Sequence, residues 1–193
     1  SLKRIKDVNG RLELIKNFPN NIRVYVDFAH TPDALQKTLD ALKNSRGQNI
    51  TLVFGCGGER DFKKRPIMAK IAKLNCKKIY VTDDNPRNEN PKKIRNEITR
   101  NLINANYFEI GNRALAIRTA IKNAEPNEVI LVAGKGHESE QIYKNQIIKI
   151  SDKKIIKKLK VKIKKISKRK QNFLQNEIIF NEIQKGYNVK NFH

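Results

Sequence analysis

The sequence predicts an α/β domain whose mostly parallel sheet has helices on both faces and an antiparallel strand at one edge. Two observations lead to this fold class. Short runs rich in valine, isoleucine and leucine alternate along the chain with segments of helical periodicity, an order that is typical of parallel sheets. The apolar runs are also continuous, as expected for strands that are covered on both faces.

The first strand is predicted over residues 22–28. Thr31 then suits a helix N-cap, and Pro32 suits the first helical position because its missing amide proton costs nothing there. Leucines follow at helical spacing: Leu35, Leu39 and Leu42. This spacing indicates a helix that packs one face on the sheet.

Four more strands are predicted over 50–54, 78–82, 107–110 and 128–133. The helices after the first three of these should bury three stripes: Ile67, Ile71 and Leu74; Ile94, Ile98 and Leu102; Ile117, Ala120 and Ile121. A hairpin over 141–148, turning at Lys144-Asn145, would add the antiparallel edge. Ser151 and Asp152 then cap a last helix.

The composition is strongly basic. The 193 residues include 41 Lys and Arg against 19 Asp and Glu, a formal net charge of +22, which favours partners that carry phosphate, including nucleic acid. The lysines are spread along the chain, however, and this spread is also typical of an AT-rich genome. Two cysteines and the lack of a secretory or membrane-length apolar run predict a cytoplasmic protein.

Polar clusters follow four of the predicted strands, at residues 27–33, 55–65, 83–89 and 134–138. Ligands of open α/β sheets bind outside the carboxyl ends of the strands, so these clusters should converge on one crevice. In the third cluster, Arg87 can bind a carboxylate with two parallel hydrogen bonds, and Asp84 and Asn85 can accept from an ammonium group. The cluster therefore suits a zwitterion. The alternative is a solvated turn in which Asn90 caps the next helix.

The glycine-rich clusters do not match the common nucleotide motifs. Residues 55–58 can aim backbone amides at an anion, with Arg60 and Arg65 beside them, but Arg60 stands where G-x-G-x-x-G requires its last glycine. Residues 134–136 lack the spacing of a Walker loop. His30 and His137 have no cysteine near them in the sequence, so no metal site is predicted.

Four motifs, in order, resemble the C-terminal domain of Mur ligases, of the MurE type: residues 27–35, 55–68, 83–87 and 134–138. The resemblance covers residues 9–158 and implies a Rossmann-like form of the predicted fold. It also implies an ATP-dependent amide ligase of peptidoglycan and cell-wall biosynthesis, needed for cell shape and division. Such a ligase adds meso-diaminopimelate to UDP-N-acetylmuramoyl-L-alanyl-D-glutamate through an acyl phosphate.

The resemblance also assigns residues by motif position. It implies a diaminopimelate site made of Arg60, Asp84, Asn85, Pro86, Arg87, Gly134 and Glu138. It implies nucleotide contacts from Arg11, Asp27 and His30. The sequence Asp-Asn-Pro-Arg goes with diaminopimelate in this family, whereas lysine-adding relatives lack the arginine. Diaminopimelate has a second carboxylate that Arg87 suits, and an unpaired guanidinium would disfavour lysine.

The family's Walker loop, magnesium ligands and UDP-sugar domain are not among these motifs. The resemblance therefore implies that ATP and Mg²⁺ are bound mainly by a missing central domain and that this fragment alone is inactive. Residues 1–21 would be an arm from the central ATPase domain, 22–160 the C-terminal amino-acid-binding domain, and 161–193 a basic and then amphipathic tail. The alternatives are a nucleic-acid-binding module, for which no motif is recognisable, and a related ligase with another acceptor.

Overall fold

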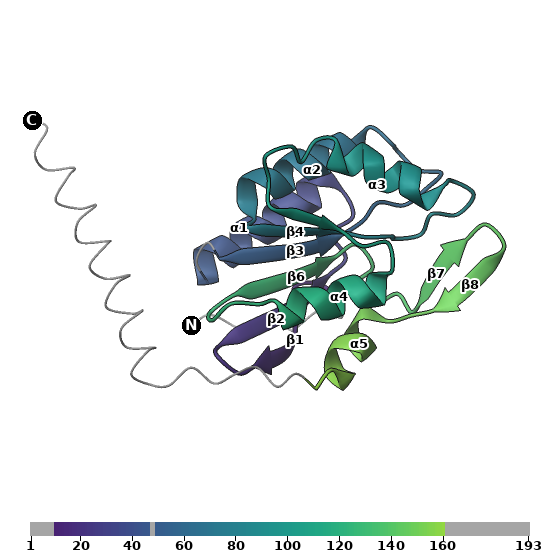
Figure 1. Ribbon diagram of the computed structural model, residues 1–193. Coiled ribbons are helices and arrows are strands. Elements are labelled where there is room, and N and C mark those ends of the chain that lie inside the picture. Colours follow the sequence, from purple (N-terminus) through teal and green to yellow (C-terminus); the bar gives the residue numbers. More distant parts are fainter. Residues whose placement is uncertain (1–9, 47–48, 161–193) are drawn as a thin grey trace, which may run out of the picture. The chain divides into compact units, whose positions relative to one another are not determined.

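The computed structural model describes residues 10–46 and 49–160 (Figure 1). A six-stranded sheet with the order β1-β2-β6-β3-β4-β5 forms its centre. Every pair of neighbouring strands in it is parallel except β1 and β2. The strands are β1 Glu13–Phe18, β2 Ile22–Asp27, β3 Ile50–Phe54, β4 Lys78–Val81, β5 Tyr107–Glu109 and β6 Val129–Ala133.

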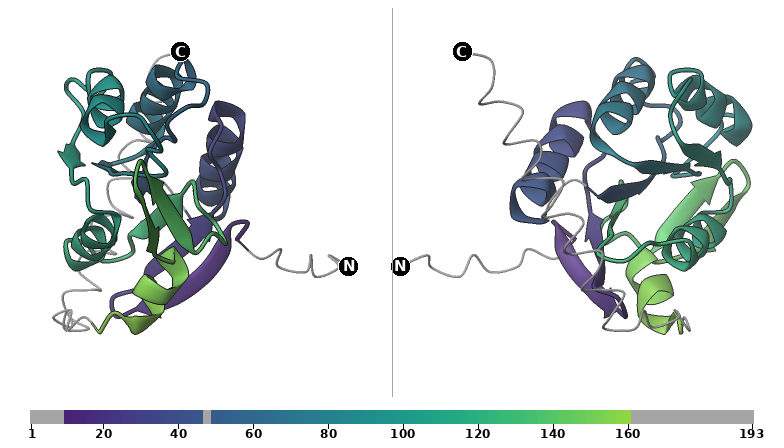
Figure 2. Two further views of the ribbon diagram at one scale, coloured as in Figure 1. Left: turned by 90° about the vertical axis from the view of Figure 1, so that its right-hand side faces the viewer. Right: turned by 60° about the vertical axis from the view of Figure 1, so that its left-hand side comes forward.

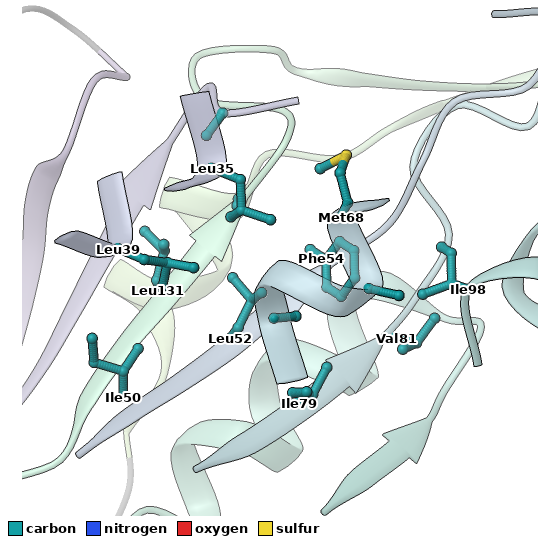
Figure 3. Close-up of a cluster of buried hydrophobic side chains, with 14 of the residues drawn as sticks. Leu35, Leu39, Ile50, Leu52, Phe54, Met68, Ile79, Val81, Ile98 and Leu131 are labelled. Atoms are coloured by element: carbon teal, nitrogen blue, oxygen red, sulfur yellow. The ribbon is translucent and has the colours of Figure 1, made fainter. Parts of the chain in front are cut away.

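Helices cover both faces of this sheet, as Figures 1 and 2 show. They are α1 Pro32–Arg46, α2 Lys64–Asn75, α3 Pro91–Thr99, α4 Arg113–Lys122 and α5 Asp152–Lys158. Side chains from α1, α2 and α3 form one core with the strands, including Leu39, Met68 and Ile98 around Leu52 and Phe54 (Figure 3). Helix α4 packs on β3, β4 and β6 and also contacts α5. The mostly parallel α/β fold predicted from the sequence is confirmed.

The predicted strands and helix caps agree closely with the structure. Thr31, Asn90 and Ser151 each accept hydrogen bonds from backbone amides of the helix that follows. The predicted inward stripes of α1, α3 and α4 are buried. None of the helices in the described ranges has the length and apolarity that crossing a bilayer requires.

Helix α2 buries a different face from the one predicted. Ile67 and Leu74 are 48% and 80% exposed, whereas Arg65, Met68, Ala69 and Ala72 face inward. Two forces set this rotation: the guanidinium of Arg65 pairs with carboxylates of Glu89 and Glu97, and the alanines allow α2 to lie close between α1 and α3. The predicted inward stripe was therefore wrong at Ile67 and Leu74, whereas Ile71 is partly buried against the core.

The antiparallel edge of the sheet is also placed differently. It is β1, which lies within the segment predicted as an arm at 1–21, and Asn20 and Asn21 between β1 and β2 adopt positive φ, which asparagine tolerates. The predicted hairpin is present as β7 Glu140–Tyr143 and β8 Gln146–Lys149, but it forms a sheet of its own. The predicted tail at 161–193 lies outside the described residues.

Glu128 and Lys78 form a paired cluster of buried charges at the amino end of the sheet. Glu128, directly before β6, is 0% exposed. Its carboxylate accepts from Lys78 Nζ at 3.1 Å, from Glu125 N at 2.7 Å and from the Thr51 hydroxyl. Lys78 also pairs with the Glu125 carboxylate at 3.0 Å. Each strong donor or acceptor here has a protein partner, so this cluster stabilises the fold.

Candidate functional site

A cleft of about 600 Å³ opens at the carboxyl ends of the strands. Residues from all four polar clusters line it, so the predicted convergence is confirmed. Among the residues assigned to diaminopimelate, the cleft is lined by Arg60, Asp84, Asn85, Arg87, Gly134 and Glu138. His30 lines it too, whereas Pro86, Arg11 and Asp27 do not.

Asp84 contributes a carboxylate oxygen that the protein leaves without a partner. Its Oδ1 accepts from Asn85 N at 2.8 Å, but its Oδ2 is buried and has no hydrogen bond within the described residues. Gly134, at φ +113°, lies against Oδ2, and a Cβ there would come within 2.9 Å of that oxygen. A buried acceptor without a donor costs free energy, so Asp84 is suited to receive a donor from a ligand.

Glu138 lies in the same cleft and belongs to a small hydrogen-bonded network. Lys135, only 1% exposed, donates from Nζ to Glu138 Oε2 at 2.8 Å and to Asn85 Oδ1 at 3.0 Å. Asn85 Nδ2 also donates to Glu138 Oε2 at 3.1 Å. Burial raises the pKa of Glu138, but the hydrogen bond and positive charge of Lys135 outweigh it, so the net shift is downward. Glu138 is therefore an anion at neutral pH.

Sequence reasoning did not assign Lys135 to the site. In the sequence, Lys135 is marked only by its position between Gly134 and Gly136 at the end of a strand. Its partner Asn85 is distant in the chain, and its partner Glu138 is an ordinary polar residue. Only the structure shows that Lys135 is buried and does not line the cleft. Lys135 holds the two site residues Asn85 and Glu138 in fixed positions.

Arg87 places a guanidinium in the cleft from a strained backbone position. Its φ is +53°, an unusual conformation for a residue with a Cβ. Its Nη1 donates to Gly58 O at 2.8 Å and to Asn85 O at 3.3 Å. Its Nε and Nη2 make no hydrogen bond within the described residues, and neither does the side chain of Arg60. These two guanidinium groups can therefore bind carboxylates.

Gly58, in the glycine-rich loop, has a packing role that the sequence did not suggest. Gly58 N donates to Asn85 O at 2.9 Å, and a Cβ on Gly58 would lie 1.9 Å from Pro86 O. Glycine is thus needed because the loop packs tightly on residues 85–86, where Pro86 is buried. Arg65, expected beside an anion, is 1% exposed and bound to Glu89 and Glu97, so it is structural.

The residues assigned to the nucleotide lie beside the cleft. Phe28 is half-buried, with the His30 ring edge-on at 4.7 Å, the His137 ring stacked at 5.5 Å and the Arg11 guanidinium 5.8 Å from its centroid. The Asp27 carboxylate is buried and accepts three hydrogen bonds, from Leu12 N, Ala29 N and the Thr38 hydroxyl. Asp27 therefore fixes the segment that carries Arg11.

Two further features bear on the chemistry of the cleft. In residues 10–46 and 49–160, no group of three or more His, Cys, Asp or Glu side chains is placed to hold a metal ion. Cys56 lines the cleft, but burial raises the pKa of its thiol to about 12. The thiol is thus protonated at neutral pH and unreactive. The charged groups that line the cleft include the carboxylates of Asp84 and Glu138 and the guanidinium groups of Arg60 and Arg87.

The chain forms a mostly parallel α/β domain with a cleft at the carboxyl edge of its sheet, lined by both carboxylates and guanidinium groups. A model of the Mur ligase, glutamate ligase domain family matches residues 10–136, and the chain belongs to this family. The matched segment extends from just before β1 to the loop after β6, and it includes three of the four polar clusters of the cleft in full.

Similar proteins match most of the length of this chain. The UDP-N-acetylmuramoyl-L-alanyl-D-glutamate–2,6-diaminopimelate ligase of Rickettsia bellii (strain RML369-C) is 43% identical over 157 residues, 80% of this chain and 32% of that protein. The ligase of the same name from Haemophilus influenzae is 46% identical over 154 residues, which are 79% of this chain and 31% of that protein. A solved structure with this name has a TM-score of 0.71 at 33% identity, covering 77% of this chain and 31% of that one. The chain spans about a third of the length of these relatives.

Proposed function

We propose that this domain binds meso-diaminopimelate in an ATP-dependent ligase that adds it to UDP-N-acetylmuramoyl-L-alanyl-D-glutamate during peptidoglycan synthesis. The relatives named for this reaction support the class of ligase. The single observation that carries the assignment of the site is the buried, unpartnered Oδ2 of Asp84, in one cleft with the guanidinium of Arg87. An ammonium group of the ligand would donate to Asp84 Oδ2, and a carboxylate of the same ligand would accept from Arg87.

The chain's own residues would bind and orient the incoming amino acid. Asp84 and Glu138 accept hydrogen bonds from its ammonium groups, and Arg60 and Arg87 bind its carboxylates. Asn85 and Gly134 line the cleft around it, and Pro86 packs against Gly58 beside it. When ATP is bound by the complete enzyme, its γ-phosphate would activate the acceptor carboxylate as an acyl phosphate. The held amine would then attack that carbonyl carbon, forming the amide as phosphate leaves.

We further assign the nucleotide side of the domain to Arg11 and His30, which flank the Phe28 ring at the rim of the cleft. Asp27 contributes by holding the backbone of Leu12 next to Arg11. Phosphate and Mg²⁺ binding are assigned to the central domain of the complete enzyme.

A ligand titration of this chain tests the proposal. We would record NMR chemical shifts with meso-diaminopimelate and, at matched concentrations, with L-lysine. Selective shifts at Asp84, Arg87, Gly134 and Glu138 with diaminopimelate are the expected result. Equal responses to the two amino acids would remove Arg87 as the group that recognises the second carboxylate, and no response to either would contradict a preformed site on this domain.

A further inference from the structure

The β7–β8 hairpin stands outside the six-stranded sheet (Figure 1), and it contributes no residue to the lining of the cleft. It nevertheless packs on the loop at 83–89, which carries Asp84, Asn85 and Arg87. A parallel bridge pairs Tyr143 with Arg87. The hairpin therefore lies directly behind the residues proposed to bind diaminopimelate.

Four hydrogen bonds join three successive hairpin residues to this loop. They run from Gln141 Nε2 to Asp83 O at 3.1 Å, from Ile142 N to Asn85 Oδ1 at 3.0 Å, from Arg87 N to Ile142 O at 3.0 Å, and from the Tyr143 hydroxyl to Asp83 Oδ2 at 2.9 Å. They bind the loop at its start, middle and end. Loop and hairpin thus form one hydrogen-bonded unit, although more than 50 residues separate them in the sequence.

The bond from Arg87 N to Ile142 O explains how Arg87 stays at a positive φ. A left-handed backbone costs a non-glycine residue roughly 1–2 kcal/mol, so it persists only where its surroundings hold it. Without the hairpin, Arg87 would relax to a common backbone conformation and direct its guanidinium differently. The position of the carboxylate-binding group therefore depends on residues 141–143.

The Tyr143 hydroxyl makes one of the hydrogen bonds that hold the hairpin to the loop at 83–89. Its hydroxyl donates to one oxygen of Asp83, while Arg95 binds the other. Burial and then the neighbouring Asp83 carboxylate raise the pKa of Tyr143 above its ordinary value, so the hydroxyl remains a donor throughout the neutral range. Because Asp83 adjoins Asp84, the bond holds the start of the loop that forms the cleft wall.

We propose that the strand at 141–143 sets the selectivity for diaminopimelate over lysine, with Tyr143 as a positioning residue that acts through Asp83 and Arg87. This inference rests on the proposed function of the cleft. A loosened hairpin would weaken the hold on the second carboxylate more than the hold on the ammonium, because Arg87 bonds directly to Ile142, whereas Glu138 is also held by Lys135, which lies outside the hairpin. Lysine has no second carboxylate and should be less affected.

The test compares Tyr143→Phe with Tyr107→Phe in the 193-residue chain. Tyr107 lies on β5, and no hydrogen bond of its hydroxyl is found in the described residues, so it is a matched control. NMR titrations would give dissociation constants for meso-diaminopimelate and L-lysine, and hydrogen exchange would report on the Arg87 amide. For Tyr143→Phe we expect diaminopimelate affinity to fall about fivefold, lysine affinity to stay within about twofold, and the Arg87 amide to exchange faster.

The outcomes separate the two proposals. Unchanged discrimination in Tyr143→Phe, with a wild-type chain that discriminates, would overturn the role of the hairpin and leave the function of the cleft in place. Equal loss for both amino acids would show a general structural effect and also overturn it. A wild-type chain that binds both amino acids equally would overturn this inference and the assignment of Arg87 to the second carboxylate. Gln141→Met, which removes only the donor to Asp83 O, should act in the same direction as Tyr143→Phe.

Discussion

Glu128 at the amino end of the central sheet and Asp84 at its carboxyl end differ in whether the protein itself satisfies their carboxylates. At the amino end, Glu128 and Lys78 pair with each other, and Thr51 and Glu125 take up their remaining hydrogen bonds. At the carboxyl end, the Oδ2 of Asp84 has no partner in the described residues. The same kinds of side chain therefore stabilise the fold at one end and are available to a ligand at the other.

Under the proposed function, this difference is a cost in free energy of folding that ligand binding offsets. A closed network gains from each of its hydrogen bonds, whereas an unpartnered buried oxygen destabilises the free protein until a ligand binds. Arg87, in a left-handed backbone conformation, adds to that cost at the carboxyl end. Substitutions at the two ends should consequently separate stability from binding.

The largest effect is expected at the amino end, for Lys78→Met. This change leaves the fully buried carboxylate of Glu128 without its cation. Removing one partner of a buried ion pair costs about 3–5 kcal/mol, and the low end of that range lowers the melting temperature by roughly 10 °C for a chain of this size. Urea and thermal unfolding followed by circular dichroism would measure it.

Lys70→Met is the matched control, because Lys70 is exposed on α2 and pairs with no carboxylate in the described residues. It should change the free energy of unfolding by no more than about 0.5 kcal/mol. If Lys78→Met were as mild as Lys70→Met, the amino-end network would not contribute to stability and the contrast between the two ends would fail.

The next largest effect is expected for Asp84→Asn. Replacing the free carboxylate oxygen by an amide should weaken diaminopimelate binding by about 2–3 kcal/mol, or roughly 30- to 150-fold. The free energy of unfolding should be unchanged or higher, because the uncompensated buried charge is gone. Calorimetric or NMR titration of the variant would measure the loss of affinity, and urea unfolding of the same variant would measure the unchanged or higher free energy of unfolding.

Asp61→Asn is the control for this pair of measurements. Asp61 also lines the cleft, but it is exposed and its Oδ1 accepts a hydrogen bond from Lys63 N. We expect little change in either affinity or stability. A loss of stability in Asp84→Asn would mean that Asp84 supports the loop rather than serving the ligand.

Much of this arrangement follows from the sequence, because local patterns and one topological rule suffice for it. Continuous apolar runs mark the strands, and parallel strands bring the residues that follow them to one edge. Asp84, Arg87 and Glu138 could thus be placed in one cleft, although they come from separate parts of the chain.

The rest depends on contacts between distant residues, which no local pattern encodes. Arg60 and Arg65 look alike in the sequence, but Arg65 forms ion pairs with Glu89 and Glu97. These pairs turn the Arg65 face of α2 inward, so that Ile67 is exposed. The hydrogen bonds of Lys135 to Asn85 and of the hairpin to residues 83–87 likewise span about 50 residues. Sequence reasoning therefore places the cleft but not the residues that position its side chains.

A smaller effect is expected for Arg87→Lys. Lysine offers a single point charge where arginine offers a planar fork, so the preference for meso-diaminopimelate over L-lysine should fall about tenfold, or about 1.4 kcal/mol. Affinity for L-lysine itself should hardly change. Titration of both amino acids into the variant would measure the ratio of the two dissociation constants.

Arg65→Lys is the control for Arg87→Lys, because the guanidinium of Arg65 is buried and already paired within the protein. It should lower the free energy of unfolding and leave the ratio of dissociation constants unchanged. If Arg65→Lys altered selectivity as much as Arg87→Lys did, the distinction between paired and available arginines would not hold.

The smallest effect concerns pH and Glu138. Lys135 and Asn85 hold the pKa of this carboxyl below its ordinary value of 4.5. A carboxyl with a lowered pKa contributes stability that is present above 4.5 and is lost as the pH falls through the folded value. From pH 8 down to pH 5 Glu138 therefore stays ionised, and its titration should change diaminopimelate affinity by less than about twofold.

Lys135→Met tests the origin of this behaviour. Without the Lys135 ammonium, burial becomes the main influence and should move the pKa of Glu138 above 4.5, so that diaminopimelate affinity begins to fall with acidity at a higher pH than in the wild type. A ¹³C NMR titration of the Glu138 carboxyl, run beside the binding measurements, would show whether both changes share one midpoint. If the pKa of Glu138 stayed low in Lys135→Met, Asn85 would be the stronger influence, and the buried lysine would serve the fold in the way that Lys78 does at the other end of the sheet.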